Sequence, residues 1–183
     1  MSSRTEAEMF KENDLVMYGK TGVCRVLKIG TPDFAVGDSN QNSSKKLYYF
    51  LEPLYHSGTF YAPIDAAQIA LRPVISGRKA KSLISDIEGM DYETFSTTSI
   101  QQLSQHYQSM MDSHTCEDLL SMVKSIFAKG IEAEKNNKKL GQIDKRYMKM
   151  AGELLFGELA SALGKEKEDV EKMVFDKLEA TFA

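Results

Sequence analysis

The hydrophobic positions follow two different periods along the chain. Up to about residue 75, short apolar runs alternate with polar residues, and glycine or proline interrupts them. Beyond Ser76, apolar residues recur at intervals of three and four, which is the spacing of one face of a helix. A β part followed by an α part predicts two domains, residues 1–76 and residues 77–183.

The first domain contains several segments with the pattern of short strands. Val23–Ile29 alternates with a period near two, which places Leu27 on the apolar side and leaves Val26 with the polar residues. Close turns between short strands favour a small curled sheet or an open barrel. The other predicted strands are 15–18, 47–52, 59–62 and 71–75, joined by turns at 19–22 and 56–58, a polar loop at 30–44 and an irregular or short helical link at 64–71.

The second domain is predicted to contain about five helices. Thr115 precedes one apolar face, with the acid Asp118 three residues later, as in a helix-capping box. Gly164 is expected to end a later helix as its C-terminal cap. The fold class is therefore α+β, with an antiparallel sheet first and an all-helical domain after it. The five apolar faces are carried by residues 83–90, 100–111, 119–127, 147–162 and 170–178.

The composition indicates where in the cell the protein is expected to act. No apolar run approaches the ~20 residues that cross a bilayer, and Met1–Phe10 lacks the basic and apolar parts of a secretory signal. We therefore expect a cytoplasmic protein that does not bind a membrane. Cys24 and Cys116 stand far apart, which favours two buried small hydrophobic side chains over a disulfide or a metal pair.

The distribution of charge is more informative than the net charge of −3. Residues 1–75 are neutral, while residues 76–123 and residues 150–183 each carry a net −4. The block between them, residues 124–149, has eight basic and three acidic side chains. A basic block inside an acidic half is a candidate contact site for a polyanion.

No group of residues has the spacing of a catalytic or metal site. His56, His106 and His114 are not spaced like the paired histidines of a metal-binding helix. Gly19 and Gly22 do not have the glycine spacing of a phosphate loop or of a dinucleotide-binding motif, and a turn between strands accounts for them. We expect no enzymatic activity, cofactor, metal ion or small-molecule substrate.

Four motifs follow one another along the chain. They are MFKENDLVMYGKTGV at Met9–Val23, YYFLE at Tyr48–Glu52 with FYAPIDAA at Phe60–Ala67, ALRPVIS at Ala70–Ser76, and IDKRYM with a later Glu-Leu-Ala end within Ile143–Ala160. Their sequence and order resemble the CarD family of bacterial transcription regulators, whose N-terminal module also occurs in the transcription-repair coupling factor. The resemblance extends over about residues 9–175. Its stronger part is the strand-Pro-x-Asp-x-Ala spacing that ends at Ala67, followed by the Leu-Arg-Pro-Val-Ile-Ser run of residues 71–76.

The resemblance implies both an architecture and a function. It implies a Tudor-like β-barrel or curled antiparallel sheet, residues 1–76, that binds the RNA polymerase β subunit. It implies that the helical domain, residues 77–183, contacts promoter DNA near the upstream edge of the transcription bubble and modulates the stability of the open complex. The alternative is a protein–protein adaptor that docks on RNA polymerase without touching DNA.

Four side chains of the β domain are candidates for the polymerase contact: Arg25, Lys28, Tyr49 and Tyr61. The two tyrosines, with Phe60, are potential aromatic anchors, while the alternative places most of these rings in the core. Phe60 and Tyr61 should point to opposite faces because strand residues alternate. Arg25 and Lys28 either pair with acids on polymerase or remain solvated. An exposed sheet edge would also offer its backbone groups to a partner strand.

The candidates for the DNA contact surround the start of the fourth predicted helix. Lys145 and Lys149 share a helix face, Arg146 lies one step round it, and Lys138 and Lys139 precede them. Together they would neutralise backbone phosphates without reading the base sequence. The alternative is a solvated basic face next to a loop.

One departure from the family concerns the DNA contact. The family usually carries a tryptophan early in the helical domain, closely followed by arginines, and this tryptophan wedges at the minor groove. The present chain contains no tryptophan, and Ile100 stands near its place, followed by Gln101 and Gln102. Ile100 is either an apolar wedge between base steps or a buried member of the helix's apolar stripe, and the stripe favours burial.

Overall fold

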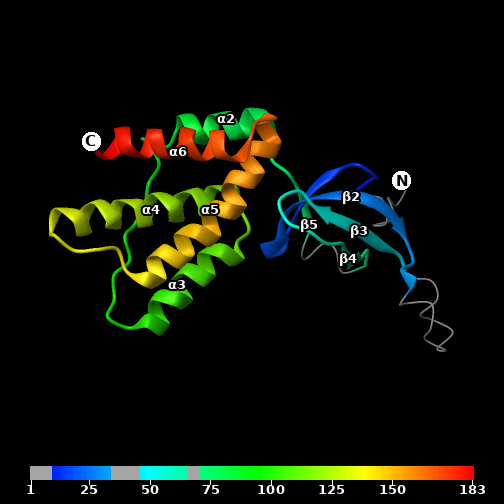
Figure 1. The fold of residues 1–183 in the computed structure, drawn as a ribbon, viewed down its shortest axis with the longest axis horizontal. Helices are drawn as coiled ribbons and strands as arrows, with labels where there is room; N and C mark the ends of the chain where they lie inside the picture. Colours follow the sequence, from blue (N-terminus) through cyan, green and yellow to red (C-terminus); the bar gives the residue numbers. More distant parts are fainter. Residues whose placement is uncertain (1–9, 34–45, 66–70) are drawn as a thin grey trace, which may run out of the picture. The chain divides into compact units, whose positions relative to one another are not determined.

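A computed structural model describes residues 10–33, 46–65 and 71–183 of the chain. Its contacts divide the chain into two compact units, Met1–Val74 and Ile75–Ala183, which are called the sheet unit and the helical unit below (Figure 1). Most of the predicted loop at 30–44 and most of the predicted link at 64–71 lie outside the described residues.

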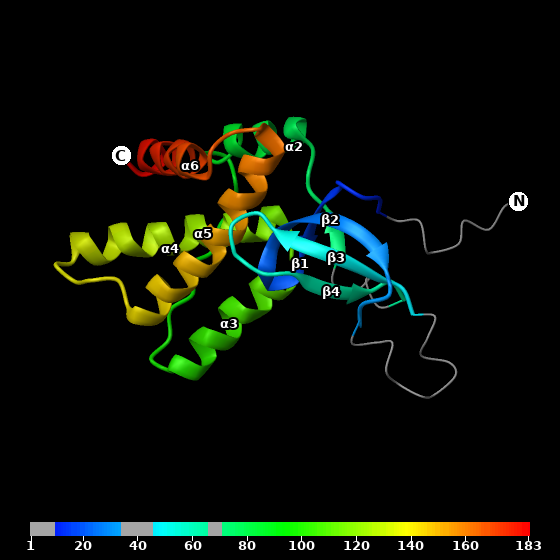
Figure 2. The ribbon, with the colours of Figure 1, turned by 45° about the vertical axis from the view of Figure 1, so that its right-hand side comes forward.

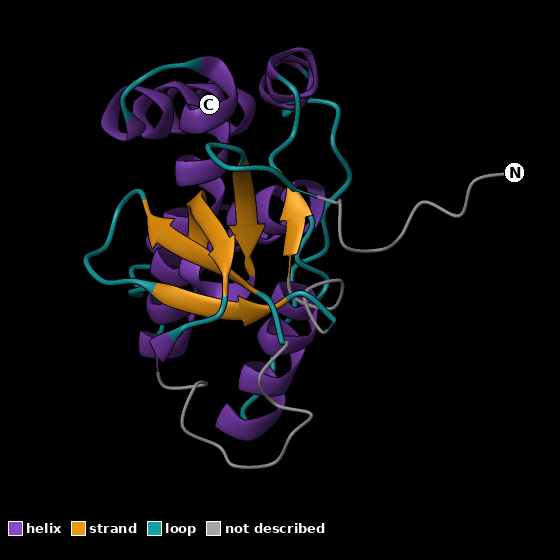
Figure 3. Ribbon diagram, turned by 90° about the vertical axis from the view of Figure 1, so that its right-hand side faces the viewer, coloured by secondary structure: helices purple, strands orange, loops and turns teal. Residues whose placement is uncertain are grey.

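The described part of the sheet unit is one antiparallel sheet of five strands, in the order β4-β3-β2-β1-β5. Figure 3 shows the strands in orange. A short 3₁₀ turn, Gly19–Thr21, joins the first two strands at the place where the sequence predicts a turn. The predicted curled antiparallel sheet is therefore confirmed. The strands are β1 (Leu15–Tyr18), β2 (Gly22–Gly30), β3 (Tyr48–Pro53), β4 (Phe60–Pro63) and β5 (Leu71–Pro73).

The sheet is not closed into a barrel. β4 and β5 form its two edges, and no pairing joins them in the part of the chain that the structure describes. Closure requires every strand to have two neighbours and a consistent stagger, which these edge strands of four and three residues do not supply. The open sheet leaves the outer backbone groups of β4 available for pairing.

A β-bulge in β2 changes which of its side chains face the core. The pairing with β3 shifts between Val26 and Lys28, so Leu27 is an extra residue on the bulged strand. Val26 and Cys24 are fully buried, whereas Leu27 is 41% exposed. The predicted inward position of Leu27 is therefore wrong, because strict alternation does not continue through a bulge. The burial predicted for Cys24 is confirmed, and it raises the pKa of the Cys24 thiol to about 11.

The helical unit packs four helices around a central one, α5, as Figures 1 and 2 show. The prediction of five helices after the sheet is confirmed. None of them is long and apolar enough to cross a membrane within the described residues. The helices are α2 (Gly77–Ser85), α3 (Ile100–Asp112), α4 (Cys116–Lys135), α5 (Gln142–Leu163) and α6 (Lys167–Phe182).

Local sequence explains where these helices begin and end. Ser76, Ser99 and Thr115 cap the starts of α2, α3 and α4 by accepting a backbone N–H three residues on. Gly164 ends α5 with a φ of 61°, a left-handed conformation that glycine adopts without steric cost. The caps predicted at Thr115 and Gly164 are therefore confirmed. The fully buried Cys116 confirms the second cysteine prediction.

Buried polar side chains of α4 hold the long connection between α2 and α3. The Nζ atom of Lys124 donates to the carbonyl oxygens of Ile87, Glu88 and Met90, at 2.6, 3.1 and 2.7 Å. Desolvation lowers the pKa of this buried ammonium, against the opposing effect of Asp91 and Glu88. A lysine rather than an apolar side chain lies here because the carbonyl groups of the connection need hydrogen-bond donors when they are buried.

Two further residues of α4 extend this contact along the same connection. The Ser125 hydroxyl donates to the carbonyl of Glu93. The Lys129 ammonium donates to the carbonyl oxygen of Phe95 at 2.9 Å. Residues 87–95 are therefore held by hydrogen bonds from one helix, although they form no helix or strand of their own apart from a short turn.

Candidate interaction surfaces

One face of the sheet carries a row of side chains that runs across three strands. Lys28 on β2 is paired with Phe50 on β3, which is paired with Tyr61 on β4. The Lys28 ammonium lies 4.5 Å from the centre of the Phe50 ring, and the Phe50 and Tyr61 rings meet edge to face at 4.9 Å. Tyr61 is 40% exposed. This row, called the Lys28–Tyr61 row below, combines a cation with two ordered aromatic rings at the surface.

Arg25 belongs to the same face of the sheet. It is paired across the strands with Glu52, and both side chains are exposed. Glu52 and Phe50 are two residues apart on β3, so their side chains point to the same side. The structure therefore brings together three of the four polymerase-binding candidates, Arg25, Lys28 and Tyr61.

Tyr49, the fourth candidate, faces the other way. Its ring is 1% exposed and packs edge to face with Phe10, with ring centres 5.9 Å apart. It is paired with the buried Ala62 of β4, on the core side of the sheet. The hypothesis that Tyr49 is a surface anchor is corrected, because strand alternation turns it inward while its neighbours Tyr48 and Phe50 turn outward.

Phe60 adds an exposed ring at the edge strand β4. It is 39% exposed and meets Tyr18 with ring centres 6.1 Å apart. Its cross-strand partner is the buried Leu51, so Phe60 and Tyr61 point to opposite faces, as alternation predicts. The edge of the sheet therefore presents apolar rings on both sides of its backbone.

In the helical unit, the first residues of α3 and α5 lie at the same end (Figures 1 and 2). A hollow of about 250 Å³ is lined by residues from the connection before α3, from α4, from the α4–α5 loop and from the start of α5. Among its lining residues are Ser96, Lys138, Lys139 and Gly141. Lys138 and Lys139 are both exposed.

The other three basic candidates lie on the first turns of α5. Lys145, Arg146 and Lys149 are all exposed, and the Arg146 guanidinium stacks 5.6 Å from the centre of the Tyr147 ring. In the described residues, none of these cations forms an ion pair with a carboxylate, and neither Lys138 nor Lys139 does. These five cations, called the α5 basic surface below, are free to meet an external anion.

Ile100 is 69% exposed, so the predicted burial of this residue is wrong. The buried stripe of α3 consists of Leu103, Tyr107 and Met111, and it starts one turn later. Helical side chains tilt towards the N-terminus of their helix, so the side chain of the first residue projects past the helix end. Ile100 therefore stands as a free apolar side chain at the end of the unit that also carries Lys138 and Lys139.

Lys124 and Lys129 belong to the basic block of the sequence, but their ammonium groups are hydrogen-bonded within the helical unit. The Lys129 ammonium lies 2.6 Å from Asp144 Oδ1 and 3.2 Å from the Tyr107 hydroxyl. The Tyr107 hydroxyl donates to the same Asp144 oxygen at 2.6 Å. Burial raises the pKa of Tyr107, with a further rise from Asp144, so the hydroxyl remains a donor. In the sequence, the position of Lys124 four residues after the apolar Leu120, on the same helix face, indicates that Lys124 is buried.

Among the residues that the structure describes, no three histidine, cysteine or acidic side chains gather as metal ligands would. Apart from Tyr49, the candidate side chains instead gather on two exposed surfaces, the outer face of the sheet and the α5 basic surface with Ile100. Both are suited to contacting another macromolecule.

Comparison with known proteins identifies the domain that the sheet unit forms. No curated protein matched the chain. The family model of the CarD-like/TRCF RID domain matches residues 10–75, and the match ends where the helical unit begins. This domain is a non-catalytic module that interacts with RNA polymerase. The chain therefore contains a CarD-like RNA polymerase-interacting domain at residues 10–75.

Proposed function

We propose that the protein is a cytoplasmic bacterial transcription regulator that binds the RNA polymerase β subunit through the outer face and free edge of its sheet. The observation that carries this proposal is the Lys28–Tyr61 row, in a domain whose family interacts with RNA polymerase. Aromatic rings held in place by neighbours lose little side-chain entropy on binding, which makes them effective anchors. Arg25 and Lys28 would meet acidic residues around such an anchor.

The edge strand β4 gives this contact a backbone component. β4 is paired with β3 on one side only, so its outer N–H and C=O groups have no strand partner among the described residues. A strand of the β subunit that added to this edge would form main-chain hydrogen bonds. It would lie directly beside Phe60 and Tyr61.

Replacing Tyr61 by alanine is expected to weaken polymerase binding by about tenfold, a typical loss for an interface anchor. The ring meets Phe50 at the surface and does not belong to the buried core cluster of the sheet unit, so the sheet should remain folded. Binding of the full chain to β-subunit fragments, measured by interferometry, provides the test. Tyr55→Ala is the matched control, because Tyr55 is 37% exposed in the turn after β3. Equal losses for both variants would contradict the proposed contact.

We further propose that the helical unit contacts promoter DNA near the upstream edge of the transcription bubble and modulates the stability of the open complex. The α5 basic surface supports this, because its cations are exposed and without carboxylate partners among the described residues. Ile100, exposed at the adjoining helix end, supplies an apolar side chain that can press between base steps. Phosphate contacts of this kind position a protein on DNA without reading its sequence.

Changing Lys145, Arg146 and Lys149 together to glutamine should weaken DNA binding and flatten its salt dependence. The logarithm of the binding constant falls with the logarithm of the salt concentration, and each lost phosphate contact makes this slope less steep by about 0.9. The control is the triple variant Lys165→Gln, Lys172→Gln and Lys177→Gln, which makes the same charge change on exposed residues at and after the end of α5. Fluorescence anisotropy with a bubble-containing promoter duplex, at several salt concentrations, measures the difference.

The adaptor alternative is favoured by the exposed Gln101 and Gln102, which stand where the family places arginines. Under this alternative, the α5 triple variant leaves DNA binding and promoter opening unchanged. Under the proposed function, it reduces promoter opening by polymerase while polymerase binding stays intact. Measuring both properties on the same variant therefore separates the two.

A further inference from the structure

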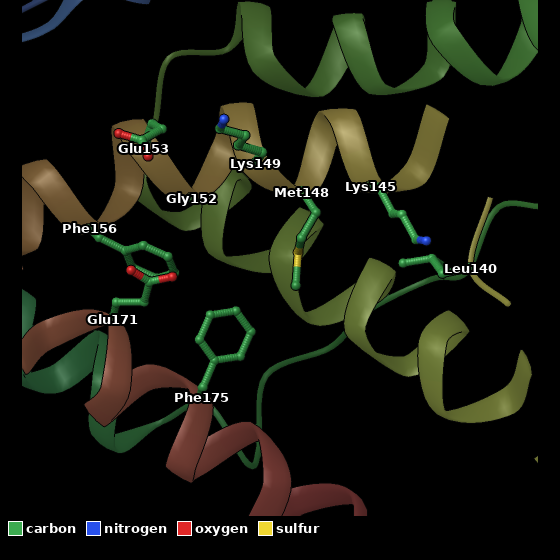
Figure 4. A pocket seen from close by; sticks show the side chains of 9 residues that line it. All are labelled: Leu140, Lys145, Met148, Lys149, Gly152, Glu153, Phe156, Glu171 and Phe175. Atoms are coloured by element: carbon green, nitrogen blue, oxygen red, sulfur yellow. The ribbon is translucent and has the colours of Figure 1, made fainter. Parts of the chain in front are cut away.

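An apolar groove runs along α5 beside the basic surface. It consists of two hollows, one of about 310 Å³ bordered by α4 and one of about 260 Å³ bordered by α6. Both are lined by Leu140, Lys145 and Met148, which makes them neighbours, and they are called the Met148 groove below. In Figure 4, Met148 and Phe156 of α5 and Phe175 of α6 point into the space between the helices.

The floor of the first hollow is apolar and its rim is mainly basic. Its apolar lining residues include Phe127, Ile131 and Met148. Lys138, Lys139 and Lys145 stand at its rim, with Glu134 as the one acidic residue that lines it. Backbone phosphates of DNA need cations but no apolar floor. An apolar floor with a mainly basic rim suits a peptide segment that carries both apolar side chains and carboxylates.

A glycine inside a helix keeps the first hollow open. Gly130 lies within α4 and lines this hollow, and a Cβ atom added there would have no neighbour within 4 Å. Glycine weakens a helix interior more than any residue except proline, and no packing contact requires it at position 130. The missing side chain deepens the first hollow at a cost to helix stability. Gly152, within α5, lines the second hollow, but a Cβ there would come within 2.9 Å of the buried Phe156 ring, so packing accounts for this glycine.

We propose that the Met148 groove binds an acidic peptide segment of a protein partner, with apolar side chains in the two hollows and carboxylates against Lys138, Lys139 and Lys145. An amphipathic helix is the form that best fits, since anchors one turn apart would enter neighbouring hollows. The partner is a protein rather than DNA because the floor is apolar. This site is separate from the polymerase contact of the sheet unit. It shares Lys138, Lys139 and Lys145 with the α5 basic surface, so an acidic peptide would compete with DNA for these cations, and peptide binding does not require the proposed DNA contact.

The first test uses the full chain with ¹³C-labelled methionine methyl groups. The probe is a short synthetic peptide of aspartate and glutamate around two leucines at positions i and i+4. We expect the Met148 resonance to shift saturably with this peptide, while that of Met173, which is exposed on α6 and lines neither hollow, stays in place. A peptide with lysine at every acidic position should produce no shift. No shift of Met148 with the acidic peptide, or a shift with duplex DNA instead, would overturn the proposal.

The second test fills the groove without removing any contact. Gly130→Leu should lower the affinity for the acidic peptide by about tenfold, because the leucine side chain occupies the first hollow. Gly130→Ala should raise the Tm, which shows that the fold does not need glycine there. Ala180→Leu, at an exposed position of α6, is the control for an added leucine. Unchanged affinity in a folded Gly130→Leu protein would also refute the site.

Discussion

Replacing Asp144 by alanine is expected to lower the free energy of unfolding of the protein by roughly 3–5 kcal/mol. Asp144 Oδ1 accepts hydrogen bonds from the Lys129 ammonium and the Tyr107 hydroxyl, both at 2.6 Å. The side chains of Lys129 and Asp144 are only 13% and 8% exposed. Removing the carboxylate therefore leaves a largely buried ammonium without its counter-charge, which is costly in a medium of low polarity.

Denaturant unfolding, followed by circular dichroism, measures this loss. Asp176→Ala is the matched control, because Asp176 pairs with Lys172 on the exposed face of α6 and its loss should have no measurable effect. Tyr107→Phe should cost about 1–2 kcal/mol, since it removes the hydrogen bonds of the hydroxyl to Asp144 and from Lys129 but retains the ion pair. An Asp144→Ala protein as stable as the Asp176→Ala protein would show that the buried pair does not support the fold.

Replacing Lys124 by methionine is expected to cost roughly 2–3 kcal/mol of unfolding free energy. The two side chains are similar in length, so the change removes the ammonium and leaves little empty space. The carbonyl groups of Ile87, Glu88 and Met90 would then lose their common donor in a site where Lys124 itself is 1% exposed. Buried carbonyls without partners destabilise the folded state.

The effect should be concentrated in the connection between α2 and α3. Hydrogen exchange of the full chain should show faster exchange in residues 87–95 of Lys124→Met, before any global unfolding. Lys177→Met, on the exposed face of α6, should change neither stability nor exchange. If residues 87–95 of the Lys124→Met protein exchange hydrogen no faster than in the unchanged protein, other contacts hold the connection.

These two networks also bear on the proposed DNA contact. The connection that Lys124 and Lys129 hold leads directly into Ser99, the N-cap of α3, and so to the exposed Ile100. Asp144 lies in the first turn of α5, next to the basic residues Lys145 and Arg146. The buried network therefore fixes two helix starts at the same end of the unit. Variants that loosen it are expected to weaken DNA contact indirectly, without removing any exposed cation.

Local sequence was sufficient to predict the type and order of the elements. Apolar periodicity separated strands from helices because the two structures repeat side-chain direction at different intervals. Capping residues such as Thr115 and Gly164 marked helix ends because they act on backbone groups within a few residues. Motif order was sufficient to recognise the polymerase-interacting domain, which the family match at residues 10–75 supports. All of these signals are carried by neighbours along the chain.

Burial and exposure at particular positions depended on residues distant in sequence. The inward turn of Val26 follows from a bulge that forms only when β2 pairs with β3. Lys124 and Lys129 are buried because distant carbonyl and carboxylate groups, from residues 87–95 and Asp144, provide their partners. Ile100 is exposed because no other element of the described helical unit covers the start of α3. The sequence alone thus determined which elements form, whereas the tertiary structure decided which side chains are free to act, since solvent exposure depends on contacts between elements rather than on the elements themselves.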